Sequence, residues 1–352
     1  MIGIQTASSQ NARLLTVSGW KLAPSSLGQK PLHLPARRCA TLDDAVAGCD
    51  LRDGATIGFH HHFRNGDRVI VAVMQALAKQ GLRRLTLVAS SIFPTHAPLI
   101  ELTRNGVIDR IVTDYVKGPV ADEIMAGGVS GLCVLQSHGG RARAIASGEL
   151  LLDATFIGAP LAHVSGAATG RGGRRPCGPL GYAMVDAAHA RRTVILADQI
   201  TNVPLALPDI PAEHVDFLLH FDQPGDPEGI RSGATIARQN QTAACISDGI
   251  ARVLDAAGVI RPGFSFQTGA GGYSLAAVAM IGERLARIGA CADFISGGIT
   301  SAHVAILKQG LAGRIRDVQS FDLDAVASSI HDPAHDPFRL RNTPARCMPR
   351  LR

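Results

Sequence analysis

A glycine-rich segment at residues 268–272, Thr-Gly-Ala-Gly-Gly, separates a short apolar run from a long amphipathic stretch. Glycines at such a strand-to-helix junction let backbone N–H groups approach an anion or a thioester oxygen, and the amino end of a helix adds favourable potential. We predict that Gly269, Gly271 and Gly272 stabilise a developing oxyanion. A tight turn that needs no ligand is the alternative. The segment is not a dinucleotide-binding fingerprint, because Ser274 replaces the third glycine of that motif.

Three adjacent histidines, His60, His61 and His62, follow an apolar run and precede Arg64. Neighbouring residues of an extended segment point to opposite sides, and no acid or cysteine at a suitable spacing completes a metal site. We therefore predict no metal. Ligands bind beyond the carboxyl ends of strands in parallel sheets, so we predict that these four residues face a polyanionic substrate. A surface loop without function is the alternative.

A third polar segment, Gln136-Ser-His-Gly-Gly-Arg141, also follows an apolar run. Arg141 carries a planar fork suited to a carboxylate, and His138 can donate a hydrogen bond to a developing oxyanion. A polar turn is the alternative for this segment. Ser90 and Thr268 occupy similar positions after apolar runs, and we predict that both contact substrate. The basic, glycine-rich stretch 171–178 is expected to be a mobile, solvated loop.

The elements that must position these residues alternate between short apolar runs and longer amphipathic stretches. One helix is predicted at 69–80, and strands are predicted at 55–59, 85–89, 132–135, 154–158, 193–197 and 215–221. These runs are apolar on both faces, which is typical of a sheet covered on both sides. Their alternation with helices predicts a mainly parallel, layered α/β sheet.

A second unit with the same strand–loop–helix pattern begins near residue 239. Helices are predicted at 241–257 and 273–288, and a strand at 292–296 is expected to run into a loop that contains Gly297 and Gly298. We predict that both glycines contact substrate. The last twenty residues show no periodicity and carry several prolines, so the second unit is expected to stop after about two strands.

Composition excludes several classes of protein. Hydrophobic residues make up 46% and charged residues 18% of the 352 residues, as in a well-buried globular protein. The net charge of +6 arises from the two ends: residues 1–40 and 339–352 hold ten of the 35 basic residues and no acid, which leaves 25 basic residues against 29 acidic ones. Neither a nucleic-acid surface nor a membrane span is predicted. The seven cysteines are scattered without a CxxC pair, which favours a reduced, cytoplasmic protein.

Several long phrases together resemble the alpha subunits of citrate lyase. They are DGATIGFHHHFRNGD (53–67), RRLTLVASSIFPTHAPLIE (83–101), LQSHGGRARAIASGEL (135–150), PCGPLGYAMVDAAHA (176–190), FDQPGDPEGIRSGAT (221–235), SFQTGAGGYSLA (265–276) and ADFISGGIT (292–300) through DVQSFD (317–322). The resemblance covers roughly residues 37 to 325. It implies a CoA-transferase-like (NagB/RpiA-type) α/β fold with two related domains and an active site between them.

The predicted domain boundaries combine this resemblance with the patterns above. They are an N-terminal tail at 1–40, a first domain at 41–238, the start of a second domain at 239–330, and an aberrant Arg- and Pro-rich tail at 331–352. Members of the family continue well beyond the point where this chain ends. The second domain is therefore expected to be incomplete, as a frameshift or a misjoined reading frame would make it.

The resemblance also implies an activity and partners. Citrate would exchange with acetate on an acyl carrier protein, so that acetyl-carrier and citrate give citryl-carrier and acetate. The thiol is a CoA-like, phosphopantetheine-type group on the carrier (gamma) subunit, and no tightly bound cofactor is expected. A beta subunit would then cleave citryl-carrier, which implies a hetero-oligomer. Many CoA-transferases carry a glutamate nucleophile where this chain has Ser296-Gly-Gly-Ile-Thr300, so no enzyme-bound thioester is expected.

Three other functions remain open from the sequence. One is a CoA-transferase or acyl-CoA hydrolase of the same fold that acts on another acid. A second is an inactive remnant that only binds the partner subunits. The third is a nicotinamide-dependent dehydrogenase, which the missing third glycine disfavours.

Overall fold

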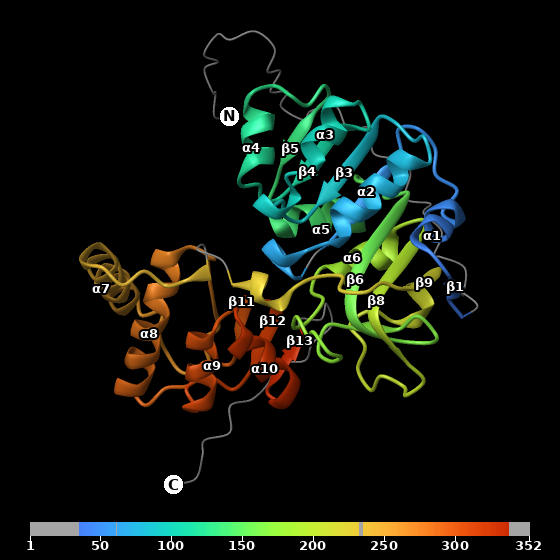
Figure 1. Ribbon diagram of the computed structural model, residues 1–352. Coiled ribbons are helices and arrows are strands. Elements are labelled where there is room, and N and C mark those ends of the chain that lie inside the picture. Colours follow the sequence, from blue (N-terminus) through green and yellow to red (C-terminus); the bar gives the residue numbers. More distant parts are fainter. Residues whose placement is uncertain (1–34, 61, 232–234, 338–352) are drawn as a thin grey trace.

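The structure, a computed structural model, describes residues 35–60, 62–231 and 235–337. Two parallel sheets, each flanked by helices, make up this part of the chain (Figure 1). The larger sheet is built from the first part of the chain and the smaller one from residues after α7. Within these ranges, every helix is too short or too polar to cross a lipid bilayer.

The larger sheet has nine strands among the described residues, in the order β1-β9-β8-β6-β2-β3-β4-β5, with β7 paired to β6 beside this path. The strands are β1 (Arg37–Cys39), β2 (Thr56–Phe59), β3 (Leu85–Ala89), β4 (Ile108–Thr113), β5 (Cys133–Leu135), β6 (Ala154–His163), β7 (Ala168–Thr169), β8 (Thr193–Thr201) and β9 (Phe217–His220). All pairs along the path are parallel, and only the β6–β7 pair in this part of the chain is antiparallel. The prediction of a mainly parallel sheet is confirmed.

Helices cover both faces of this sheet because successive strand residues point to opposite sides. In β3, Leu87 belongs to the core cluster that includes residues of the helices α1, α2 and α3, whereas Val88 belongs to the cluster that includes residues of α5 and α6. The helices of this unit are α1 (Leu42–Gly48), α2 (Val69–Lys79), α3 (Leu99–Arg104), α4 (Pro119–Met125), α5 (His138–Ala146) and α6 (Ala183–His189). Burial on both faces explains why the strands are apolar throughout.

The smaller sheet has four parallel strands in the described part, in the order β10-β11-β12-β13. Its strands are β10 (Phe266–Thr268), β11 (Ile295–Ile299), β12 (Ile315–Ser320) and β13 (His335–Pro337), and its helices are α7 (Gln241–Ala256), α8 (Gly272–Arg287), α9 (Ser301–Lys308) and α10 (Leu323–His331). Apolar residues of α8, α9 and α10 pack with those of the strands in one core cluster.

Two predicted boundaries are wrong. The second unit does not stop after about two strands, and β13 lies in the segment that was predicted as an aberrant tail from residue 331. A polar sequence forms this strand because its side chains find buried partners: His335 Nε2 lies 3.1 Å from Asp317 Oδ2, and its Nδ1 lies 2.9 Å from Ser328 Oγ. At the other end, β1 pairs with β9 although it lies in the predicted tail 1–40. Residues 1–34 and 338–352 of these tails lie outside the described ranges.

The glycine-rich stretch 171–178 is not a solvated loop along its whole length. Arg175 donates to Asp198 Oδ1 at 2.6 Å, and Cys177 is fully buried. A side chain at Gly178 would overlap Ser320 of β12, so this stretch packs closely against the smaller sheet. Glycine suits this position because its φ is +82° and because the Ser320 side chain occupies the space that a Cβ would need.

Candidate functional site

A cavity of about 780 Å³ lies between the two sheets. The residues that follow β2, β3, β4 and β5 line one side of it, and residues of β10, β11 and β12 and of the turns beside them line the other. Because β2 to β5 are neighbours in one parallel sheet, their carboxyl ends meet at the same edge, where ligands bind in such folds. None of the described residues that line this cavity is Asp or Glu.

Arg64 is the buried cation of the cavity wall. Its backbone adopts a left-handed conformation with φ of 56°, and its side chain is 6% exposed. The guanidinium carbon lies 5.0 Å from the ring centre of Phe93 and 4.5 Å from that of Phe321. Burial lowers the pKa of Arg64 to about 10, so the group remains charged at neutral pH. A desolvated cation between aromatic rings is well suited to bind a carboxylate.

Gly297 and Gly298 line the cavity, but they lie within β11 and not in a loop after it, so that part of the prediction is wrong. The register of β11 against β12 shifts between these two residues. Gly297 has φ of +99°, and a side chain at Gly298 would overlap the ring of Phe321. Gly298 thus leaves the space that the Phe321 ring occupies over Arg64.

Two helices begin at the cavity. The first residue before α8, Gly271, lines it together with Ala270, and no side chain caps the first turn of α8. At the start of α5, Ser137 accepts a hydrogen bond from the N–H of Gly140 at 3.0 Å. Both helix amino ends place partial positive charge at the cavity. The neighbouring glycines 269 and 272 do not line it, so of the three predicted glycines only Gly271 lies at the cavity wall.

His138 lines the cavity and is held by a buried carboxylate. Its Nδ1 lies 2.9 Å from Oδ2 of Asp114, which directly follows β4. The side chain of His138 is 56% exposed and that of Asp114 is 1% exposed. Burial raises the pKa of Asp114, while the hydrogen bond from His138 lowers it in part. This hydrogen bond fixes the orientation of the imidazole, because Nδ1 is bound to a carboxylate that does not line the cavity.

Of the described residues in the histidine segment, one belongs to the cavity wall. His60 lines the cavity, and its ring stacks on that of His62 with centres 4.6 Å apart. His62 is fully buried behind it, and burial lowers the pKa of His62 to about 3, so this ring is neutral and does not bind an anion. His61 lies outside the described residues. The predicted contact of His62 with an anionic substrate is therefore wrong, whereas that of His60 stays a prediction.

Two further predicted contacts are corrected by the partners that the structure gives them. Arg141 is 1% exposed and holds Asp186 with both terminal nitrogens, at 3.0 and 2.6 Å. Because its guanidinium already binds a buried carboxylate, the prediction that Arg141 binds substrate is wrong. Thr268 Oγ1 lies 2.9 Å from Nε2 of His303 and does not line the cavity. Ser90, by contrast, lies in the cavity wall, and its contact with substrate stays a prediction.

Sequence reasoning missed several residues of the site. Tyr115 and Tyr182 line the cavity, and burial raises the pKa of Tyr182, which keeps its hydroxyl protonated as a hydrogen-bond donor. Phe321 lies over Arg64 from the smaller sheet. Asp114 and Tyr115 follow β4, a strand that was not predicted because charged residues interrupt its apolar pattern. The position after a strand in a parallel sheet is the signal that would have found them.

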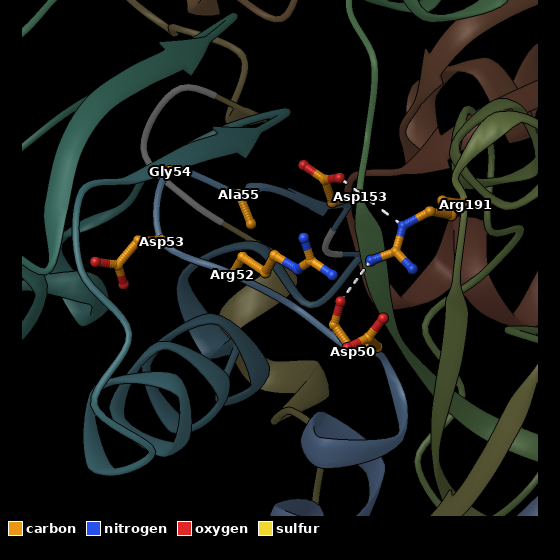
Figure 2. Close-up of a pocket in the computed structure, with 7 residues that line it drawn as sticks. All are labelled: Asp50, Arg52, Asp53, Gly54, Ala55, Asp153 and Arg191. Carbon is orange, nitrogen blue, oxygen red and sulfur yellow. Dashed lines mark hydrogen bonds and ion pairs between the residues drawn. The ribbon is translucent and has the colours of Figure 1, made fainter.

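A second pocket of about 410 Å³ lies at the opposite edge of the larger sheet, next to the amino ends of β2 and β6 (Figure 2). Arg191 donates to the backbone oxygen of Asp50 at 2.9 Å and lies 3.9 Å from Asp153. Asp53 is bound to the backbone N–H of Arg83. The charged groups of this pocket thus serve local structure. Within the described ranges, no group of three or more His, Cys, Asp or Glu side chains is arranged to hold a metal ion.

Comparison with known proteins gives one consistent family. The family model described as citrate lyase, alpha subunit, matches residues 36–339. The citrate lyase alpha chain of Klebsiella pneumoniae is 39% identical over 318 residues, which cover 90% of this chain and 61% of that protein. The corresponding Escherichia coli chain is 40% identical over 319 residues, which cover 91% of this chain and 62% of that protein. This chain therefore spans about three fifths of the length of these relatives.

Solved structures share the fold. A Streptococcus mutans crystal structure, described as the alpha subunit of citrate lyase in complex with citrate, superposes with a TM-score of 0.81 at 36% identity and covers 92% of this chain and 64% of that one. A Pseudomonas malonate decarboxylase hetero-tetramer in complex with malonate matches with a TM-score of 0.61 at 15% identity, over 81% of this chain and 52% of that one. At that identity the second likeness concerns the fold alone.

Proposed function

Because the chain belongs to the family of citrate lyase alpha subunits, we propose that it exchanges acyl groups between a thioester and citrate, so that acetyl-carrier and citrate give citryl-carrier and acetate. The observation that carries this proposal is the cavity between the two sheets, which has the buried cation Arg64 in its wall and no described acid. A citrate trianion requires cations and backbone N–H groups, and repulsion from carboxylates would weaken its binding.

The proposed reaction passes through a mixed anhydride. A citrate carboxylate attacks the acetyl carbonyl carbon, a C–O bond forms, the C–S bond breaks, and the electron pair leaves on sulfur as a thiolate. The thiolate then attacks the citryl carbonyl carbon, and acetate departs. Each attack develops an oxyanion, which the helix amino ends at Gly271 and Ser137 are suited to stabilise. The absence of Asp and Glu from the described cavity wall supports direct exchange without an enzyme-bound thioester.

Arg64 is proposed to bind a citrate carboxylate that does not react. Its ring contacts with Phe93 and Phe321 cover guanidinium surface that would otherwise be hydrated, and burial makes an ion pair stronger than it is in water. Binding of citrate by the Streptococcus mutans protein, which is 36% identical, supports this substrate.

The proposal extends to the partners of the family. We propose that the acyl group arrives on the phosphopantetheine-type thiol of a carrier subunit and that a beta subunit cleaves the citryl-carrier product. A long, flexible thiol arm suits a cavity that opens between two sheets, because the arm can deliver the thioester while the carrier protein stays outside.

The test is acetate release from acetylated carrier in the presence of citrate, with the citrate KM measured for variants. Arg64→Gln should raise the citrate KM about 10- to 100-fold, the range expected for loss of a charge-assisted hydrogen bond. Arg68→Gln is the matched control, because Arg68 is exposed, binds Gln223 and does not line the cavity. Malonate and succinate as alternative acceptors test the acid specificity. Release of acetate with these acids but not with citrate would reject the proposed substrate.

A further inference from the structure

Asp114 is a buried acid that the reaction above does not use directly. Its side chain is 1% exposed, and Oδ1 is buried without a hydrogen-bond partner among the described residues. Its other oxygen, Oδ2, lies 2.9 Å from His138 Nδ1. Burial disfavours a carboxylate and raises the pKa of Asp114. A buried acid of this kind is stable as an anion only with a cation beside it.

His138 is the group placed to supply that positive charge. The guanidinium of Arg141 also acts on Asp114 through space, but both of its terminal nitrogens are bound to Asp186. Within the described part of the chain, His138 is the one side chain hydrogen-bonded to Asp114. When His138 is protonated, the pair becomes an ion pair, and the carboxylate gains its counter-charge.

The contact also determines what His138 presents to the cavity. Nδ1 is engaged by Asp114, and Nε2 lies on the opposite side of a ring that is 56% exposed and lines the cavity. In a neutral ring with the proton on Nδ1, Nε2 can only accept a hydrogen bond, whereas in the imidazolium both nitrogens donate. An oxyanion or a thiolate needs a donor, so the imidazolium is the form that serves acyl exchange.

We propose that Asp114 is a positioning residue that holds His138 as an imidazolium, with the Nε2–H directed at the atoms that become negative during acyl exchange. The inference rests on the proposed function. When the C–S bond breaks and the electron pair moves to sulfur, His138 Nε2–H donates a hydrogen bond to the thiolate. The thiolate then attacks the citryl carbonyl, and the proton remains on Nε2. No net proton is gained or lost over the exchange.

Kinetics of two variants test the coupling. Asp114→Asn keeps the size of the side chain and removes its charge, and it should lower kcat about 100-fold, as expected for loss of one hydrogen-bond donor to developing negative charge, while the citrate KM changes less than about threefold. The double variant with His138→Gln should be no slower than His138→Gln alone, because Asp114 acts through His138. Asp109→Asn is the control and should retain full activity, because Asp109 lies on β4, the strand that Asp114 follows, but does not line the cavity. Additive losses, or an unchanged kcat in Asp114→Asn, would overturn the proposal.

A measurement without turnover tests the protonation state. In ¹⁵N-histidine-labelled protein at neutral pH, with the His138 signals assigned by their loss in His138→Gln, both ring nitrogens of His138 should carry protons in the wild type, and this doubly protonated form should diminish in Asp114→Asn. A wild-type ring without a proton on Nε2 would refute the imidazolium. Because the spectrum requires no acyl exchange, it separates failure of this inference from failure of the proposed function.

Discussion

The described histidines near the cavity differ in how deeply their rings are buried. His60 and His138 lie in the wall, whereas His62 is fully buried behind His60. Neither ring nitrogen of His62 has a hydrogen-bond partner among the described residues. A protonated ring there would be a buried charge without compensation. Burial therefore disfavours protonation of the His62 ring.

We expect the free energy of unfolding of His62→Leu to fall less than that of the wild type as the pH is lowered. The pKa of His62 in the folded chain is about 3, below the value of about 6.5 in an unfolded chain, so the unfolded chain binds the proton more readily. Stability linked to the neutral ring is complete above about pH 6.5 and is lost as the pH falls toward 3. The loss is about 2 kcal/mol at about pH 5. Urea unfolding at about pH 7.5 and about pH 5 measures it.

The variant His220→Gln is the control, because this histidine is exposed at the end of β9. Between the two pH values, its free energy of unfolding should fall by the same amount as that of the wild type. His62→Leu should lose about 2 kcal/mol less. Equal losses in His62→Leu and the wild type would show that the buried ring does not resist protonation.

For single residues, the sequence predicted which positions lie near the cavity better than it predicted which side chains contact each other. Position after an apolar strand is a local property, and the residues selected by it include Arg64, His60 and Ser90, which line the cavity. The prediction that Arg141 binds substrate was wrong because its partner, Asp186, lies 45 positions away in the sequence. No local sequence pattern predicts such a buried ion pair. Asp114 was missed for the same reason, since its hydrogen-bond partner His138 lies 24 positions away, at the start of α5.

At the scale of elements, a glycine in β11 makes room for the aromatic ring of the smaller sheet that contacts Arg64. Gly298 leaves room for the ring of Phe321, and that ring lies 4.5 Å from the guanidinium carbon of Arg64. The glycine pair is therefore explained by packing within this sheet as well as by its position in the cavity wall. A cation from one sheet is held in part by an aromatic ring from the other.

We expect Gly298→Ala to displace Phe321 and to weaken citrate binding. The added methyl group would overlap the ring, and overpacking of this kind costs about 1–3 kcal/mol. With the ring displaced, Arg64 loses one of its two aromatic contacts, and the citrate KM should rise roughly tenfold. Thermal unfolding and the citrate KM, measured on the same preparation, check both effects.

Gly249→Ala is the matched control for this substitution. Gly249 lies within α7, and a methyl group there meets no atom within 4 Å. Alanine should stabilise this helix by about 0.5–1 kcal/mol and leave the citrate KM unchanged. If Gly298→Ala behaves like Gly249→Ala in both measurements, the proposed link between β11 and Arg64 is wrong.

Strands with uniform apolar sequences were predictable, and strands with mixed sequences were not. The strands β3, β6 and β8 were recognised because burial on both faces requires a continuous apolar run. The strands β12 and β13 were missed because Arg316, Asp317 and His335 interrupt theirs. These side chains are buried and bind partners on other elements or stack on a ring, so the polar pattern reflects tertiary structure.

At the scale of the whole molecule, the site exists only while the two sheets remain in contact. The cavity wall comes from both sheets, and Arg64 lies between Phe93 of one and Phe321 of the other. The segment that ends at Gly181 fixes this contact by packing against β12. A methyl group on Gly181 would overlap the backbone oxygen of Val318, which cannot move without disturbing the strand.

We therefore expect Gly181→Ala to separate the sheets without unfolding either of them. The residue has φ of +40°, so alanine adds about 1–2 kcal/mol of backbone strain to the overlap with Val318. Gly81→Ala isolates the strain, because Gly81 has φ of +88° and a methyl group there meets no atom within 4 Å. Both variants should lose stability, but only Gly181→Ala should show a larger radius of gyration by small-angle X-ray scattering and a raised citrate KM. If its scattering and KM match those of Gly81→Ala, the packing of Gly181 on β12 does not hold the two halves of the site together, and the contacts of Arg64 with Phe93 and Phe321 must suffice.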